Sequence, residues 1–264
     1  MNPARAPNPS IDLNADIGER DADGSDATAE AALGTLVTSV NIACGGHAGN
    51  ERTMRAAVRR AAAHACAIGA HPAYPDREGF GRRTVPIPAD TLSETLTTQI
   101  GALARIASDA GAGLRHVKPH GSLYHDASTH EAIARAIMDA ARAHDPALRL
   151  IGPAASQAVR WWRAWGARVG EEGFVDRVYE ADGRLRDRDR PGALLRTPDK
   201  AAAQAVQIAT RGTATASDGS TVRVPAQTLC LHADTPDAVA IAERVGRALQ
   251  GVGVTLRALD HTAS

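Results

Sequence analysis

Short stretches of alternating polar and apolar residues recur along the chain, and most are followed by a polar loop and an amphipathic segment. In residues 11–18, IDLNADIG, polar Asp12, Asn14 and Asp16 share one face of a predicted strand, and apolar residues take the other. Further strands are predicted at 36–44, 67–71, 114–117, 148–152, 168–170, 227–234 and about 252–256. Helices are predicted at 51–65, 89–110, 127–144, 157–166, 198–210 and 236–249, with a hairpin near Asp218 and Gly219.

Strand, loop and helix alternate some seven times with short connections, which indicates parallel strands joined by right-handed crossovers. The sequence has no G-x-G-x-x-G between a strand and a helix and no phosphate-binding G-x-x-x-x-G-K-[ST]. A closed or nearly closed barrel is therefore favoured over a doubly wound sheet. We predict an α/β fold, a TIM-like (β/α) barrel of about seven parallel strands. It would form one domain over residues 11–258, between tails at 1–10 and 259–264.

Polar side chains gather where these strands end. The strand at 114–117 and the residues after it place His116, Lys118 and His120 on one face. His71 ends the strand before it, and His47 lies in a glycine-rich loop that follows the strand at 36–44. Because the carboxyl ends of parallel strands meet at one rim of a barrel, we expect these side chains to line a common site.

Two other segments could contribute to that rim. The strand at 227–234 places Cys230, His232 and Asp234 on one face. The loop at 74–88 is too long for an ordinary connection and is expected to cover the site. Its candidate ligand contacts are Tyr74, Asp76, Arg77, Phe80 and Arg82. All three cysteines are interpreted as small buried hydrophobic residues rather than nucleophiles.

Acids, imidazoles and a lysine at one rim suit a hydrolase. An Asp or a His can take a proton from water, and Lys118 can stabilise an oxyanion or a phosphorylated oxygen. The same Asp and His side chains could instead hold a divalent metal ion that activates the water. Sequence spacing does not separate these two readings. A serine nucleophile has little support, because the sequence lacks G-x-S-x-G.

Composition narrows the class of partner. Lys and Arg number 30, as do Asp and Glu, so the chain has no overall field that would attract nucleic acid or an anionic membrane. No apolar run approaches the roughly 18 residues of a membrane span, and the first ten residues lack the apolar core of a signal peptide. The absence of C-x-x-C pairs favours a reducing compartment, so we expect a cytoplasmic protein that binds a small molecule.

Several long motifs, in this order, resemble the LamB/YcsF family of 5-oxoprolinase A subunits. They are IDLNADIGE at 11–19, NIACGGHAGN at 41–50, IGAHPAYPDREGFGRR at 68–83, HVKPHGSLYH at 116–125, DRVYEADGRL at 176–185 and QTLCLHAD at 227–234. The resemblance implies an irregular (β/α) barrel of the glycoside hydrolase/deacetylase type. It also implies ATP-dependent opening of 5-oxo-L-proline to L-glutamate, with ADP and phosphate as products and ATP as a co-substrate of a complex with partner subunits B and C.

Rim position and resemblance together give the expected site. The expected catalytic residues are Asp16, His47, His71, Lys118 and His120. The expected substrate-binding residues are Asp12, Asn14, Asn41, Arg82, Tyr124 and His232. Whether a divalent metal ion takes part is left open at this point, as is the component of the complex that binds ATP.

The match to the family departs at four positions, which are Gly46, Asn50, His125 and Ala233. Asn50 stands where the family usually has Asp, and it caps a helix as well as Asp does. Two other functions are compatible with the residues. One is a metal-dependent amide or acetyl hydrolase that works alone with Asp16, His47, His71 and His120. The other is a non-catalytic subunit that binds a small carboxylate or lactam.

Overall fold

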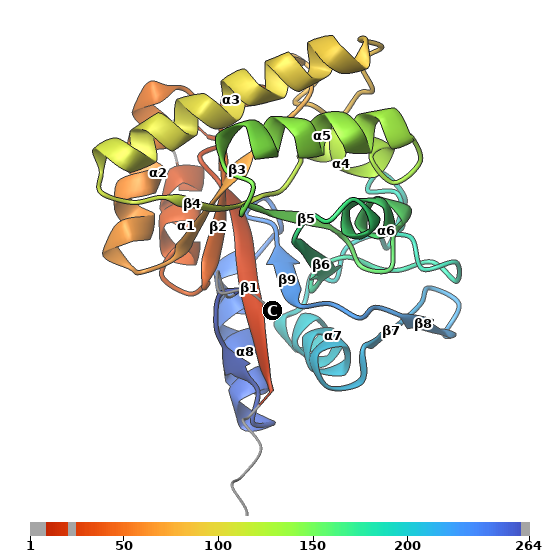
Figure 1. Ribbon diagram of the computed structural model, residues 1–264. Coiled ribbons are helices and arrows are strands. Elements are labelled where there is room, and N and C mark those ends of the chain that lie inside the picture. Colours follow the sequence, from red (N-terminus) through yellow and green to blue (C-terminus); the bar gives the residue numbers. More distant parts are fainter. Residues whose placement is uncertain (1–8, 21–24, 260–264) are drawn as a thin grey trace, which may run out of the picture.

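The computed structural model describes residues 9–20 and 25–259. Seven parallel strands close into a barrel, and the helices lie around its outside (Figure 1). The barrel strands, in spatial order, are β1 (Ser10–Ile17), β2 (Ser39–Ala43), β3 (Ala67–His71), β4 (Leu114–Val117), β5 (Arg149–Pro153), β6 (Val169–Phe174) and β9 (Thr228–Leu231). β9 then pairs with β1 and closes the barrel. The predicted α/β barrel of about seven parallel strands is confirmed.

Helices cover the outer face of the barrel. They are α1 (Ser25–Leu33), α2 (Glu51–Ala63), α3 (Ala89–Asp109), α4 (Gly121–Asp126), α5 (Glu131–His144), α6 (Gln157–Ala164), α7 (Pro198–Arg211) and α8 (Ala238–Gly251). α3 packs along α5, and α7 packs along α8. In the part of the chain that the structure describes, no helix is both long and apolar enough to cross a bilayer.

Three short strands complete the fold. β10 (Thr255–Leu256) adds to the start of β1, where Ser10 pairs with Thr255. β7 (Thr213–Thr215) and β8 (Thr221–Arg223) form the predicted hairpin at the edge of the molecule (Figure 1). Of the predicted tails, residues 1–8 and 260–264 lie outside the described residues, whereas Ser10 already belongs to β1.

Local sequence fixes the start of α2. The Asn50 side chain accepts a hydrogen bond from the Thr53 backbone N–H, and the Thr53 hydroxyl accepts one from the Asn50 backbone N–H. This reciprocal pair satisfies two of the donors that a helix N-terminus leaves free. Asn50 therefore preserves the helix cap at a position where an Asp was expected.

The strands carry apolar side chains outward and polar side chains into the barrel. On β1, Leu13 and Ala15 are fully buried in the apolar layer beneath the helices. The inward residues make hydrogen bonds to one another inside the barrel, as Asn41 of β2 does with Asn14 of the neighbouring β1. A TIM barrel is usually filled by branched apolar side chains, so a hydrogen-bonded polar interior indicates that the lumen serves more than packing.

Element boundaries differ from the prediction mainly where polar residues are buried. β6 reaches Phe174, whereas a strand of only three residues, 168–170, was predicted. Glu172 is 1% exposed and is accommodated by hydrogen bonds inside the barrel. α4 begins at Gly121, several residues before the predicted helix start, and α5 begins separately at Glu131.

Candidate functional site

The site lies at the carboxyl ends of the barrel strands, and Lys118 is at its centre. The Lys118 Nζ lies 2.9 Å from Asp16 Oδ1, 3.1 Å from Glu172 Oε1 and 3.1 Å from Cys230 Sγ. Burial lowers the pKa of Lys118, but the charge of Asp16, together with the neighbouring Cys230 and Glu172, outweighs it and holds that pKa well above its ordinary value. The lysine is therefore a buried ammonium with a carboxylate on two sides.

Both carboxylates are held in place by further donors. Asp16 accepts a hydrogen bond of 2.8 Å from Asn41, and Glu172 accepts bonds of 2.9 Å from Asn14 and 2.7 Å from the Tyr124 hydroxyl. Burial raises the pKa of Asp16, but His71 and Lys118 pull it well below its ordinary value. Asp16 is thus ionised at neutral pH and has a fixed orientation.

Two histidines beside Asp16 have tautomers that the backbone sets. His71 Nδ1 lies 2.7 Å from the Lys118 carbonyl oxygen, and His120 Nε2 lies 3.0 Å from the Phe80 carbonyl oxygen. A carbonyl oxygen can only accept, so each of these ring nitrogens carries a hydrogen. With the hydrogen on these nitrogens, His71 Nε2 and His120 Nδ1 are the ring atoms that can present a lone pair to the site.

Glu19 and His47 close one side of this cluster. Glu19 Oε1 lies 3.0 Å from His47 Nε2 and 3.3 Å from His120 Nδ1, and the His47 and His120 rings stack with centroids 3.6 Å apart. Burial lowers the pKa of His47 to about 4, so this imidazole is neutral at physiological pH. Burial raises the pKa of Glu19, but the neighbouring His120 and His47 rings lower it well below its ordinary value.

A separate ion pair lies on the β9 side of the mouth, by which we mean the end of the barrel formed by the carboxyl ends of its strands. His232 Nδ1 lies 3.0 Å from Asp176 Oδ2, and the His232 ring stacks on Phe174 with centroids 5.7 Å apart. Burial lowers the pKa of His232, but Asp176 raises it above its ordinary value. The pKa of Asp176 falls to about 2, because His232 outweighs the effect of burial.

The loop after β3 lies across the histidines. Gly81 has φ of 64°, and a Cβ there would lie 2.9 Å from His47 Cβ and 3.0 Å from His120 Cδ2. Glycine therefore allows this backbone to approach both rings. Arg82 extends from the loop to Asp234, with Nη2 3.3 Å from Oδ2, and Arg188 pairs with the same carboxylate.

Most expected site residues meet at this mouth. Lys118, Asp16, His71 and His120 form a chain of contacts in that order, and His47 stacks on His120. Four expected substrate-binding residues lie around them, with Asn14, Asn41 and Tyr124 bonded to the buried acids and His232 beside Phe174. Arg82 stands at the rim with a side chain 53% exposed.

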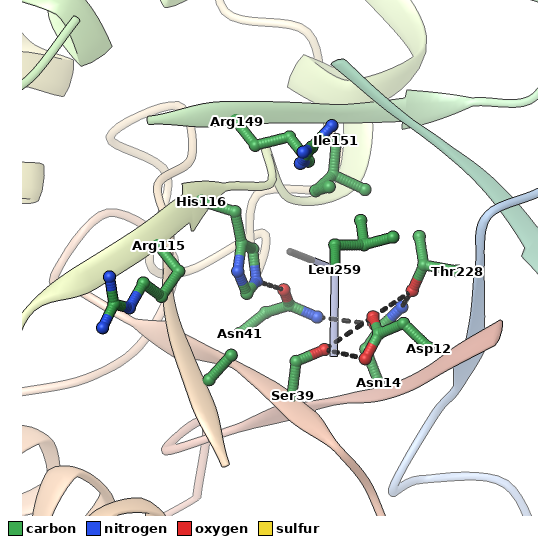
Figure 2. A pocket seen from close by; sticks show the side chains of 11 residues that line it. Asp12, Asn14, Ser39, Asn41, Arg115, His116, Arg149, Ile151, Thr228 and Leu259 are labelled. Carbon is green, nitrogen blue, oxygen red and sulfur yellow. Dashed lines mark hydrogen bonds between the residues drawn. The ribbon is translucent and has the colours of Figure 1, made fainter. Parts of the chain in front are cut away.

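The structure does not bring Asp12 to the rim. Asp12 is near the start of β1, where the hydroxyls of Thr38, Ser39 and Thr228 donate to its carboxylate at 2.5 to 2.8 Å. Figure 2 shows it in a small polar hollow with Asn14, Asn41 and His116. Its hydrogen-bond partners among the described residues are protein hydroxyls, so we assign Asp12 a structural role.

Four residues at the mouth were missed by the sequence reasoning. They are Glu19, Glu172, Asp176 and Cys230. Glu19 ends the motif IDLNADIGE directly after the first strand, and that position could have identified it. Cys230 was interpreted as a buried hydrophobic residue, and it is buried, but its Sγ also contacts the Lys118 ammonium.

Comparison with known proteins extends this picture. The LamB/YcsF family model matches residues 11–264. The 5-oxoprolinase A subunit of Methylococcus capsulatus is 49% identical over 252 residues, which span 94% of this chain and 95% of that protein. The lactam utilization protein from Thermus thermophilus has a TM-score of 0.87 at 40% identity, covering 95% of this chain and 100% of that one. A family 4 carbohydrate esterase from Streptomyces lividans shares the fold alone, with 11% identity, a TM-score of 0.51 and coverage of 97% and 95%.

Proposed function

Because the chain belongs to the LamB/YcsF family, we propose that it is the A subunit of a 5-oxoprolinase, a hydrolase that opens a cyclic amide. The substrate would be 5-oxo-L-proline and the product L-glutamate. The similarity to a protein named as the A subunit of 5-oxoprolinase runs through 94% of the chain, and a structure named a lactam utilization protein shares the whole barrel. Most of the side chains that line the mouth belong to the sequence motifs that resemble the family.

The observation that carries the proposal is the buried Lys118 ammonium between Asp16 and Glu172. Opening a lactam places negative charge on the former carbonyl oxygen, and a fixed ammonium in a water-poor site stabilises such charge strongly. The lone pairs of His71 and His120 and the carboxylates of Asp16 and Glu19 converge beside it. They can orient a water molecule and accept its proton.

Coupling to ATP has a chemical reason. An unstrained five-membered lactam resists hydrolysis, and transfer of the γ-phosphoryl group of ATP to its carbonyl oxygen makes the carbon electrophilic. One water then adds to that carbon, the ring nitrogen leaves as an amine, and a second water releases phosphate from the acyl phosphate. We propose that partner subunits B and C contribute to this activation, while this chain binds the ring and directs water. The absence of a phosphate-binding loop from the sequence is compatible with that division.

The rim of the mouth suits an anionic intermediate. Arg82 and Arg188 converge on Asp234, which leaves an excess of positive charge at that point. A substrate carboxylate or phosphoryl group would compete with Asp234 for these guanidinium groups. We place the reaction in the cytoplasm, where ATP is supplied and where the three free thiols of the chain remain reduced.

The test is release of glutamate and phosphate from 5-oxoproline and ATP by the purified chain, with and without subunits B and C. We expect release only from the full mixture. Lys118→Ala should abolish it, and Lys200→Ala, which changes the exposed lysine of α7, should not. Absence of release from a well-folded mixture, or equal activity of Lys118→Ala, would contradict the proposal.

The histidine cluster supports a second candidate, a metal-dependent amide or acetyl hydrolase that acts without partners. Its supporting observation is that Glu19, His47, His71 and His120 place donor atoms within 4.8 Å of one another. This candidate requires turnover without ATP that a chelator abolishes. ATP-dependent release that needs subunits B and C would exclude it as the main activity.

A further inference from the structure

The hydrogen bonds of His71 and His120 leave an electrostatic conflict between them. Each ring donates one N–H to a backbone carbonyl, so His71 Nε2 and His120 Nδ1 face each other with their lone pairs, 3.0 Å apart. Two lone pairs at that distance repel unless a proton or a metal ion lies between them. The geometry therefore requires a positive charge at this point.

Two carboxylates converge on the same point. Asp16 Oδ2 lies 3.4 Å from His71 Nε2, and Glu19 Oε1 lies 3.3 Å from His120 Nδ1 and 3.8 Å from His71 Nε2. Ligands at about 2.1 Å from a metal ion are separated by about 3.0 Å in octahedral and about 3.4 Å in tetrahedral coordination. A proton bridges two atoms, whereas three of these four separations are close to the edges of a coordination shell, and the fourth, 3.8 Å between Glu19 and His71, is somewhat longer.

The local charge also favours a cation. Asp16 and Glu19 both lie within 4 Å of His71 Nε2, and the Lys118 ammonium that pairs with Asp16 is shared with Glu172. The cluster beside His71 thus has more carboxylates than cations. A buried excess of negative charge is costly, and a divalent ion would offset it.

From this arrangement we propose a divalent transition-metal site formed by His71 Nε2, His120 Nδ1, Glu19 Oε1 and Asp16 Oδ2. Two imidazoles with carboxylates suit Zn²⁺, Co²⁺ or Fe²⁺ rather than Mg²⁺ or Ca²⁺, which prefer oxygen ligands alone. The backbone carbonyls of Lys118 and Phe80 fix both ring orientations from behind. Metal-binding histidines usually have such a partner on their second nitrogen.

His47 has a different role in this site. Its Nε2 contacts Glu19, and its buried Nδ1 has no hydrogen-bond partner among the described residues. Binding of a metal through Nε2 would place the ring hydrogen on Nδ1 and leave a buried donor unsatisfied. We assign the ring hydrogen to Nε2, which donates to Glu19, so His47 is a positioning residue that orients Glu19.

The metal site stands on the geometry alone and holds whether or not the substrate is 5-oxoproline. A bound ion would lower the pKa of a water ligand to about 7 and so supply a nucleophile beside Lys118. Metal binding is measured without substrate, ATP or partner subunits. Its failure would therefore leave the proposed function untouched, and failure of the activity assay would leave the site untouched.

The experiment is calorimetric titration of the full chain, stripped of metal with a chelator, with Zn²⁺, Co²⁺ and Mg²⁺. We expect one Zn²⁺ or Co²⁺ per chain, no Mg²⁺ binding, and a rise in melting temperature with Zn²⁺. Bound Co²⁺ should show visible bands without a sulfur charge-transfer band. Such a band would overturn the proposal, because it would place the ion instead at Asp16, Cys230 and His232, the other group whose donor atoms converge.

Matched variants assign the ligands. Glu19→Gln and His120→Ala should weaken Co²⁺ binding more than about 100-fold, and His47→Gln, which removes a positioning residue, about 10- to 100-fold. His64→Ala and Glu78→Gln change exposed residues outside the cluster and should bind as the unchanged chain does. Circular dichroism checks the fold of each variant. Absence of stoichiometric binding by the unchanged chain, or undiminished binding by folded Glu19→Gln and His120→Ala, would overturn the proposal.

Discussion

Replacing Lys118 with methionine tests the charge arrangement at the centre of the mouth. The ammonium lies 2.9 Å from Asp16 and 3.1 Å from Glu172, and each contact contributes about 5 to 6 kcal/mol of gross attraction at an effective dielectric constant of about 20. Desolvation of the three ions offsets much of that attraction. Lys118→Met leaves two buried carboxylates without their cation, so we expect a loss of about 3 to 5 kcal/mol in the free energy of unfolding.

The measurement is urea denaturation followed by the fluorescence of the tryptophans in and next to α6. Lys200→Met is the matched control, because Lys200 is exposed on α7, and it should change stability by less than about 0.5 kcal/mol. The double variant Lys118→Met with Glu172→Gln removes one of the stranded charges. The loss of unfolding free energy in the double variant should therefore be smaller than the sum of the losses in the two single variants, by about 0.5 to 3 kcal/mol.

One combination of results would refute this reasoning. If Lys118→Met costs no more than Lys200→Met, and if its effect adds to that of Glu172→Gln, the ammonium does not hold ionised carboxylates in place. Lys118 would then act through packing alone, and its proposed role opposite a developing oxyanion would lose its electrostatic basis.

The remaining predictions concern pH, packing and thiol reactivity. The pKa of Asp176 is depressed to about 2, so the stability that Asp176 gains from pairing with His232 is present above about pH 4 and is lost as the pH falls toward 2. The pKa of His232 is raised, so the stability that His232 gains is complete below its ordinary pKa and is lost as the pH rises through the raised pKa. Asp176→Asn should flatten both limbs of a plot of melting temperature against pH, and an unchanged plot would contradict the pairing. Gly69→Ala should lower the free energy of unfolding by about 1 to 3 kcal/mol, because the added Cβ would lie 2.0 Å from His116 Nε2. Gly113→Ala is the control, because a Cβ at Gly113 meets open space and should not lower stability. Equal melting temperatures of the two variants would contradict this packing at Gly69. All three cysteines are buried with raised pKa values, so a thiol reagent at neutral pH should label them only after denaturation, and rapid labelling of the native chain would exclude that burial.

Hydrophobic periodicity correctly predicted the bounds of the barrel strands that are followed closely by a proline. The strand at 67–71 ends before Pro72, and the strand at 114–117 ends close to Pro119; both have the predicted bounds. β6 was predicted only over 168–170, and it continues through Glu171 and Glu172. Glu172 is buried there only because Asn14, Lys118 and Tyr124 approach it from distant segments, and a local pattern contains no information about such partners.

The candidate site was predicted in part for the same reason. Alternation along β1 correctly placed Asp12 and Asp16 on the inner face, but it did not tell at which end of the lumen each would act. Four residues of strand correspond to about 13 Å, which separates the mouth from the hydroxyl-lined base. Glu19 follows the strand on an irregular backbone, where alternation no longer applies, and only the fold shows that it meets His120.

Closure of the barrel has a consequence for the order of folding. β1 pairs with β2 early in the sequence and with β9 late, and Asp12 bonds to Thr228 across 216 positions. Contacts of such separation form slowly, so the seam between β1 and β9 should be among the last parts to assemble. Asp16 lies on one side of this seam and His232 on the other, which makes the complete mouth a product of the final folding step. Any ligand that bridges the two sides would therefore stabilise the closed seam and slow the unfolding of the chain.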